Sequence, residues 1–342
     1  MNSEFSKLKR RDLLKLACLA GLSLAIPLMK LSGICGSFRS RQSFRMSTRA
    51  LGTTVTIRVE EDLSPARAQA AINDAFAEIH RLETQLTRFQ PSSQVYRLNQ
   101  QTRVESPTPG FIEVLSQARY FYERTEGAFD ITVKPALDLF QNHLDSGLLP
   151  SDADFEAAKR LIDFEQLSFS KDCVSVAKLG MGITLDCIAK GYVLDRAAAR
   201  MRSHGIRSAL IEGGGTLVAI GARPDDSPWR IGIRDPLNPD ELIGTIGMVN
   251  AAVATSGDYE DFFSPDGRFY HIIDPASARS PLYSHSATVT APTALEADPL
   301  GVTLMVDPRK GLKLLESFKG CECLIATREG GLIRSSGFGV LS

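Results

Sequence analysis

The chain has 342 residues, 43% of them hydrophobic, and a formal net charge of −1; this length allows one large globular domain or two smaller ones. The charge is unevenly distributed. Residues 1–45 hold nine Lys and Arg but two Asp and Glu, which leaves 30 basic and 38 acidic residues in the remainder. An acidic body without a basic block argues against a nucleic-acid-binding protein. The four cysteines of this body are too few for a disulfide scaffold.

The first thirty-five residues have the pattern of a twin-arginine (Tat) export signal. Arg10 and Arg11 precede a nearly apolar run over residues 16–29, and basic residues follow it. Because this run is shorter than the about 20 residues that span a bilayer, an N-terminal membrane anchor is the less favoured alternative. Lipidation of Cys35 is a further alternative, which is not favoured because Ile34 stands where a small residue usually precedes the cysteine.

The sequence therefore divides into three parts. We expect a signal peptide over residues 1–35, a linker rich in Ser and Arg over residues 36–46, and one functional domain over residues 47–342.

The domain shows helical periodicity mainly in its first half and strand patterns mainly in its second. Helices are expected over residues 65–86, 110–126, 154–162, 186–204, 293–306 and 309–318. Strands are expected over residues 51–59, 208–212, 217–221, 229–234, 242–249, 251–256, 269–273, 286–291 and 323–327. This order favours an α+β fold over a repeating βαβ fold.

Several familiar motifs are absent from the sequence. There is no GxxxxGK[ST] phosphate loop, no HExxH or Cys/His quartet for zinc, and no GxSxG nucleophile elbow. The glycines at residues 213–215 precede a strand-like segment, so they do not form a dinucleotide-binding fingerprint.

Two polar, glycine-containing segments accompany helix ends. Residues 127–132 (GAFDIT) follow the second expected helix, where a C-cap glycine and a turn aspartate are the simpler explanation. Residues 185–192 (LDCIAKGY) enter a helix, whose free N–H groups can bind a phosphate. Lys190 in that first turn opposes the helix dipole; an anionic partner and a merely solvated lysine are equally good explanations.

Three further segments of this kind follow. They are residues 255–259 (TSGDY), 271–275 (HIIDP) and 297–300 (ADPL). His271 lies in an expected strand, where a hydrogen-bonded core histidine is the simpler explanation. Asp298 lies in an otherwise apolar helix, where a carboxylate needs a partner; Mg²⁺ is one candidate, and a helix N-cap role is the other.

Together the order and spacing of these segments resemble those of the ApbE family, the FAD:protein FMN transferases, over residues 51–335. The matching stretches are residues 51–53 (LGT), 127–132, 188–192 with Asp195, 214–215, 228–229, 255–259, 271–275 and 297–298. The resemblance implies an α+β fold related to the T-fold, with helices that flank mixed or antiparallel sheets.

The resemblance also implies an activity. Members of this family use Mg²⁺ and FAD to transfer FMN to a Ser or Thr hydroxyl of an acceptor flavoprotein, with release of AMP. Chemistry at a pyrophosphate depends mainly on positioning and charge neutralisation.

Site residues follow from the same resemblance. FAD contacts are implied for Leu51, Phe89, Ala128, Phe129, Asp130, Thr184, Lys190 and His271. Phe89 would border the flavin ring, Lys190 would lie near the phosphates, and His271 would assist the acceptor hydroxyl or the phosphates. Mg²⁺ ligands are implied for Asp298, the backbone carbonyl of Cys187 and the position of Val302.

The chain departs from the family at this metal site. A Thr usually stands four residues after the metal-binding Asp, and Val302 cannot ligate a metal. Thr303, Asp186 or a water could take its place. Thr184 stands where many members have an acidic residue, and Leu51 replaces the usual Met.

Three functions therefore compete. The first is an exported, Mg²⁺-dependent FMN transferase, and the second is an FAD-binding maturation or accessory protein with little transfer activity. The third is hydrolysis of FAD to FMN and AMP, with water as the nucleophile. The expected location is the periplasm after export by the Tat translocase, with inner-membrane association as an alternative. Similar Tat-exported relatives occur beside nitrous-oxide-respiration genes, where the partner is a membrane-bound flavoprotein.

Overall fold

The computed structural model describes residues 43–146, 149–259, 262–264 and 267–340. The expected signal peptide and most of the expected linker lie outside these residues. The helices are α2 (Pro65–Leu86), α3 (Gln94–Gln101), α4 (Pro109–Arg124), η1 (Ile131–Val133), α5 (Lys134–Ser146), α6 (Asp152–Lys159), η2 (Phe164–Gln166), α7 (Ala189–Ser203), α8 (Ala294–Val306) and α9 (Pro308–Leu315). No helix among the described residues is long and apolar enough to cross a membrane.

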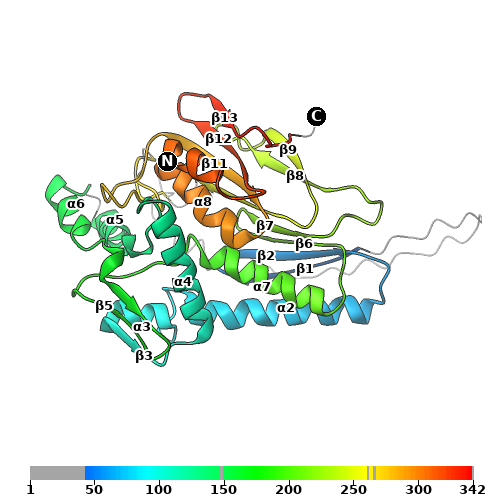
Figure 1. Cartoon of the computed structure of the whole chain (residues 1–342), viewed down its shortest axis with the longest axis horizontal. Coiled ribbons are helices and arrows are strands. Elements are labelled where there is room, and N and C mark those ends of the chain that lie inside the picture. Colours follow the sequence, from blue (N-terminus) through cyan, green and yellow to red (C-terminus); the bar gives the residue numbers. More distant parts are fainter. Residues whose placement is uncertain (1–42, 147–148, 260–261, 265–266, 341–342) are drawn as a thin grey trace, which may run out of the picture. The chain divides into compact units, whose positions relative to one another are not determined.

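Within the described part of the chain the strands form three sheets, and their order agrees with the α+β fold predicted from the sequence (Figure 1). The main sheet has the antiparallel order β1-β2-β6-β7-β10-β11-β12-β13. Its strands are β1 (Ser43–Ala50), β2 (Thr53–Glu60), β6 (Ala209–Gly213), β7 (Thr216–Ile220), β10 (Ala252–Gly257), β11 (Ser284–Ala291), β12 (Glu322–Thr327) and β13 (Leu332–Arg334). The smaller sheets are β3-β5-β4 (Arg103–Glu105, Cys173–Val176, Leu167–Phe169) and β8-β9 (Trp229–Arg234, Leu242–Met248).

Alternating side chains decide which face of β1 and β2 is buried. Val55, Ile57 and Val59 of β2 are fully buried on the helix-covered face, as a period of two predicts for a half-buried sheet. The opposite face of the hairpin is exposed and carries Arg45 directly across from Arg58. β1 therefore forms a polar edge of the sheet.

The helices cover the buried face in a layer that α2 and α7 dominate (Figure 1). Ser64 caps α2 by accepting a hydrogen bond from the Arg67 amide, and Pro65 occupies the first turn. α8 is apolar nearly all round because it packs against β10 and β11 on one side and against α7 and α9 on the others.

The β8-β9 sheet covers part of the other face of the main sheet. Trp229, Ile231 and Ile246 pack there against Ala219 of β7 and Val253 of β10. Arg45 and Arg49 of β1 stay exposed, whereas the Arg58 guanidinium of β2 lies 5.8 Å from the ring centroid of Trp229 in β8.

Three predictions about secondary structure were wrong. Residues 43–46, expected in the linker, form the first half of β1; their polar residues alternate with Phe44 and Met46, which pack on the core. Residues 269–273 form no strand but one isolated bridge, from Tyr270 to Phe262, because the Tyr270 amide donates to Ser280 Oγ instead of to a neighbouring strand. The helix expected from residue 186 begins at Ala189, after a turn.

Candidate functional site

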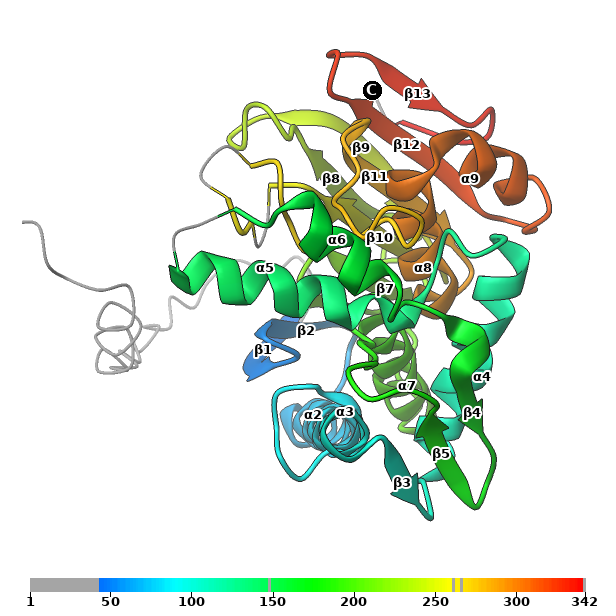
Figure 2. The same ribbon diagram turned by 90° about the vertical axis from the view of Figure 1, so that its left-hand side faces the viewer.

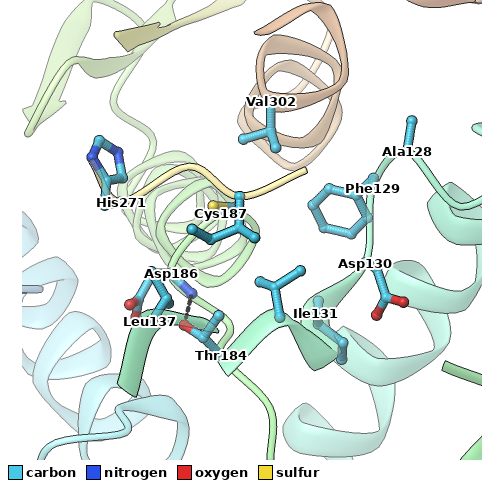
Figure 3. Close-up of a pocket in the computed structure, with 12 residues that line it drawn as sticks. Ala128, Phe129, Asp130, Ile131, Leu137, Thr184, Asp186, Cys187, His271 and Val302 are labelled. Atoms are coloured by element: carbon cyan, nitrogen blue, oxygen red, sulfur yellow. Dashed lines mark hydrogen bonds between the residues drawn. The ribbon is translucent and has the colours of Figure 1, made fainter. Parts of the chain in front are cut away.

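A cavity lies where four distant segments of the chain meet (Figure 3). They are η1 with the start of α5, the turn before α7, the segment before the Asp274–Arg279 bridge, and α8. Figure 2 shows the arrangement of α5, α7 and α8. Its lining residues are Ala128, Phe129, Asp130, Ile131, Val133, Leu137, Thr184, Asp186, Cys187, His271, Ile273 and Val302. Seven of the residues predicted for the site are among them: Ala128, Phe129, Asp130, Thr184, Cys187, His271 and Val302. The cavity is mainly apolar, with a few polar groups on its wall, as is usual for sites that bind cofactors.

Asp130 lies at the start of η1 and is almost completely buried. Its Oδ1 accepts hydrogen bonds of 2.7 Å from both the amide and the hydroxyl of Thr132. Burial nevertheless raises the pKa of this carboxyl to about 6, because the two hydrogen bonds only partly offset the lost hydration. The expected turn aspartate is present, since Asp130 caps η1. The C-cap of α4 is Thr125, however, and Gly127, with a φ of 81°, lies two residues beyond it.

The turn before α7 is held in place by backbone and side-chain contacts from two other elements. Asn99 of α3 accepts a 2.7 Å hydrogen bond from the Ile183 amide and donates one of 2.9 Å to its carbonyl. The Thr184 amide donates to the Ile131 carbonyl at 2.8 Å. These contacts fix the segment that places Thr184, Asp186 and Cys187 on the cavity wall.

Asp186 and Cys187 occupy the cavity wall in different ways. Oδ2 of Asp186 accepts a 2.7 Å hydrogen bond from Arg88 Nε, so this carboxylate is already paired. Burial, followed by the charges of Asp186 and Asp298, raises the pKa of the Cys187 thiol to about 12. A thiol of this kind is not a nucleophile at neutral pH, which leaves the backbone carbonyl as the group that Cys187 can offer.

Lys190 lies in the first turn of α7 but does not line the cavity. Its Nζ donates a 2.8 Å hydrogen bond to the Gly214 carbonyl, in the turn between β6 and β7. Gly214 and Gly215 both have positive φ values, of 53° and 80°, which glycine adopts without strain. The amino group of Lys190 is therefore held at the β6–β7 turn, beside the N-terminal end of α7.

Asp298 is buried in α8 and is hydrogen-bonded on both carboxylate oxygens. Oδ2 accepts a 2.7 Å bond from the Gly191 amide of α7, and Oδ1 accepts one of 2.8 Å from the Thr216 hydroxyl of β7. Burial raises the pKa of Asp298, although nearby Lys190 and these hydrogen bonds oppose the rise. Asp298 lies in the helix interior, so the alternative N-cap role is wrong; Thr293 is the N-cap.

The same two helices are joined by a second carboxylate. Asp195 of α7 accepts hydrogen bonds from the amides of Ala294 and Leu295, at 3.1 and 2.9 Å, and so satisfies the N-terminus of α8. Burial raises the pKa of Asp195 to about 6. Each of these two helices thus donates backbone hydrogen bonds to a carboxylate of the other.

The structure separates the candidates for the missing Thr ligand. Val302 lines the cavity, whereas Thr303 is fully buried and its hydroxyl donates to the Pro299 carbonyl at 2.8 Å. Thr303 therefore faces its own helix, and Asp186 is paired with Arg88. Both side-chain replacements are thus engaged in other contacts, and the water alternative stays a prediction. Among the described residues, no three His, Cys, Asp or Glu side chains cluster as a ready metal site.

His271 lies across the cavity from Ala128, Phe129 and Asp130 (Figure 3). Its ring centroid is 6.3 Å from that of Tyr270. Tyr270 is fully buried and donates to the Pro281 carbonyl, so it anchors the segment that carries the histidine. His271 is half-buried on the cavity wall, unlike the core histidine of the simpler explanation.

Leu51 and Phe89 lie outside the cavity lining. Leu51 has a φ of 55°, and its amide donates to Glu83 Oε1 at 2.6 Å. Phe89 is 67% exposed, with the Arg88 guanidinium 4.1 Å from its ring centroid. The FAD contacts expected of Leu51, Phe89 and Lys190, and the metal role of Asp298, stay predictions.

Sequence reasoning missed Asn99, Arg88 and Thr216. Each acts through one long-range contact, and a single polar residue in an ordinary helix, loop or strand gives no local pattern. Asp195 was part of the matched stretches, but its capping role was not predicted.

Comparison with known proteins supports the family resemblance. The model of the ApbE family matches residues 51–325. The FAD:protein FMN transferase of Treponema pallidum is 28% identical over 317 residues, which cover 85% of this chain and 86% of that protein. The enzyme of the same name from Haemophilus influenzae is 29% identical, with 85% of this chain and 88% of that protein covered.

Solved structures agree with these sequence matches. The crystal structure of the ApbE protein of Thermotoga maritima superposes with a TM-score of 0.78 at 31% identity, over 87% of this chain and 98% of that one. The flavin transferase ApbE of Vibrio cholerae superposes with a TM-score of 0.75 at 26% identity, over 86% and 97% of the two chains.

Proposed function

The chain belongs to the ApbE family, and we propose that it is an FAD:protein FMN transferase that depends on Mg²⁺. It transfers FMN from FAD to a Ser or Thr hydroxyl of an acceptor flavoprotein and releases AMP. The observation that carries this proposal is the cavity, which gathers residues from 128 to 302 that the family resemblance names and that lie far apart in the sequence.

The residues around Asp298 fit a Mg²⁺ ion. Mg²⁺ in phosphoryl-transfer sites is usually held by one or two carboxylates, with substrate phosphates and water as the other ligands. Asp298 would provide one ordered carboxylate, and Cys187, which lines the cavity, would provide the neutral oxygen of its backbone carbonyl. When bound, Mg²⁺ would neutralise charge on the pyrophosphate.

The protein groups then position the two reactants. The hydroxyl oxygen of the acceptor attacks the phosphorus of the FMN half, the bond from that phosphorus to the bridging oxygen breaks, and AMP leaves with this oxygen. On the family resemblance we assign the phosphate oxygens to Lys190 and the N-terminus of α7. We assign His271 to the hydroxyl proton, because it is the histidine on the cavity wall.

One assay tests the function. The purified domain is incubated with FAD, Mg²⁺ and an acceptor domain that carries a Ser/Thr flavinylation site, and covalent in-gel fluorescence and AMP are measured. Labelled acceptor and AMP in equal amounts are expected. AMP without label would identify an FAD pyrophosphatase, and bound FAD without AMP an accessory protein.

A single variant tests the role of His271. His271→Ala should lose transfer while its FAD affinity, measured by quenching of flavin fluorescence, stays close to that of the wild type. Full transfer by this variant would remove His271 from the proton transfer.

The place of action is a separate part of the proposal. Arg10, Arg11 and the apolar run after them support export by the Tat translocase and action in the periplasm, on an exported or membrane-bound flavoprotein. Replacement of both arginines by Lys should abolish export, measured by fractionation of cells that produce the full chain. Normal export of that variant would contradict the Tat route.

A further inference from the structure

Thr216 is a buried polar residue whose hydroxyl is directed at the carboxylate of the proposed metal site. It is the first residue of β7 and is fully buried, and its Oγ1 donates a 2.8 Å hydrogen bond to Asp298 Oδ1. We infer that Thr216 is a positioning residue that orients Asp298 toward Mg²⁺. The inference rests on the proposed function, because it presupposes that Asp298 binds the ion.

The direction of this hydrogen bond follows from the chemistry of the two groups. An ionised carboxylate has no proton to donate, so the hydroxyl must be the donor. A carboxylate has acceptor sites for about four hydrogen bonds, and the contacts with Thr216 and the Gly191 amide use one on each oxygen. Acceptor capacity therefore remains on both oxygens for a cation.

The two contacts hold the two oxygens of the carboxylate from two different elements. Thr216 holds Oδ1 from the sheet, and Gly191 holds Oδ2 from the first turn of α7. Without the hydroxyl, the Asp298 side chain is held at Oδ2 alone and can turn about its last torsion angle. Such outer contacts of metal-binding carboxylates commonly change metal affinity 10–100-fold when they are removed.

The position of Thr216 is itself secured. It directly follows Gly214 and Gly215, whose positive φ values form the β6–β7 turn. Lys190 Nζ donates to the Gly214 carbonyl at 2.8 Å, so the turn is tied to α7 beside the Gly191 contact. Three hydrogen bonds thus join the main sheet, α7 and α8. Two of them end on the Asp298 carboxylate, and the third, from Lys190, ends on the Gly214 carbonyl.

The test compares three variants. Thr216→Val keeps the shape of the side chain and removes the donor, whereas Thr216→Ser keeps the donor and removes a methyl group. Thr303→Val is the matched control, because this equally buried hydroxyl donates to the Pro299 carbonyl and not to Asp298. Metal binding is measured with Mn²⁺, whose free-ion electron paramagnetic resonance signal falls on binding, with FAD present and absent.

We expect Thr216→Val to raise the dissociation constant for Mn²⁺ about 10-fold, and Thr216→Ser and Thr303→Val to change it less than about 2-fold. The metal-free unfolding free energy of each variant is measured by urea titration. If Thr216→Val does not fold, Thr216→Ala against Thr216→Ser makes the same comparison.

The possible failures are distinct. Wild-type affinity for Mn²⁺ in Thr216→Val would overturn the positioning role and leave the proposed metal site intact. Equal losses in Thr216→Val and Thr303→Val would also overturn it, since they would indicate a general packing effect. A wild-type protein that binds no Mn²⁺ with FAD present would overturn the metal site and this inference with it.

Discussion

The backbone amide of Gly191 donates a 2.7 Å hydrogen bond to Oδ2 of Asp298, and so joins the first turn of α7 to the interior of α8. The contact requires the two helices to approach closely. A Cβ atom at residue 191 would lie 2.2 Å from the Ala294 carbonyl oxygen. Glycine is thus the residue that permits this approach, and the candidate metal site depends on it.

Replacement of this glycine should therefore be costly. Gly191→Ala must separate α7 from α8, and we expect a loss of at least about 2 kcal/mol in the free energy of unfolding, as for other overpacked sites. Urea denaturation followed by circular dichroism measures it. Gly339→Ala is the control, because a Cβ there meets no atom within 4 Å; equal stability of the two variants would show that the helices can move apart freely.

Asp298 and Asp186 should differ in their response to metal. In the presence of FAD, Mg²⁺ should raise the melting temperature of the wild type and of Asp186→Asn, but not that of Asp298→Asn. The physical reason is that the Asp186 carboxylate is paired with Arg88, whereas both oxygens of Asp298 are oriented by neutral donors. A Mg²⁺ response that disappears in Asp186→Asn and persists in Asp298→Asn would assign the metal to Asp186.

Asn99 should affect both stability and flavin binding. Asn99→Leu removes both hydrogen bonds to Ile183, and we expect a cost of about 1–3 kcal/mol for the unpaired backbone groups. FAD affinity should fall as well, because the segment that carries Thr184 loses its support; a fluorescence titration measures this. Asn73→Leu, on the exposed face of α2, is the control. Unchanged FAD affinity in Asn99→Leu would mean that the Ile131 contact alone holds the turn.

Asp130 should make stability depend on pH between about 4 and 7. Because burial raises its folded pKa from 3.8 to about 6, the folded state binds this proton more tightly than the unfolded state. The stabilisation is complete below the unfolded pKa and is lost as the pH rises through 6, in total about 3 kcal/mol.

Asp130→Asn tests this pH dependence without removal of the local hydrogen bonds. Both bonds from Thr132 end on Oδ1, which an Asn carbonyl oxygen can replace. Urea unfolding at pH 4, 5, 6 and 7 should show a smaller decrease in stability for this variant than for the wild type. If the unfolding free energies of the variant and of the wild type change equally with pH, a group other than Asp130 causes the pH dependence.

The sequence placed some residues of the cavity wall and not their supporting contacts. Asp130, Cys187 and His271 were named from the family resemblance of the short segments that carry them, and the cavity brings these segments together; their roles stay predictions. Asn99 and Thr216 were not found, since a hydrogen bond to a partner 84 or 82 residues away leaves no trace in local periodicity.

The same limit applies to the fold. The long amphipathic helix ending at Leu86 was predicted to the residue, because its apolar period is regular and its N-cap is strong. β1 was taken in part for a linker, since an edge strand with Arg45 and Arg49 on its outer face has the composition of an exposed loop. The short strands β3, β4 and β5 were missed because three or four residues are too few to establish a period of two.

The order of the strands has a consequence for when the cavity forms. β2, which ends at Glu60, pairs with β6, which begins at Ala209. Two neighbouring strands of the main sheet are therefore separated in the sequence by a long segment of the chain. The cavity walls come from Ala128 through Val302. Contacts between such distant segments form late and cooperatively in folding. A nascent chain that has not passed Val302 lacks one wall of the cavity, so the proposed flavin site can be complete only after that residue has been synthesised.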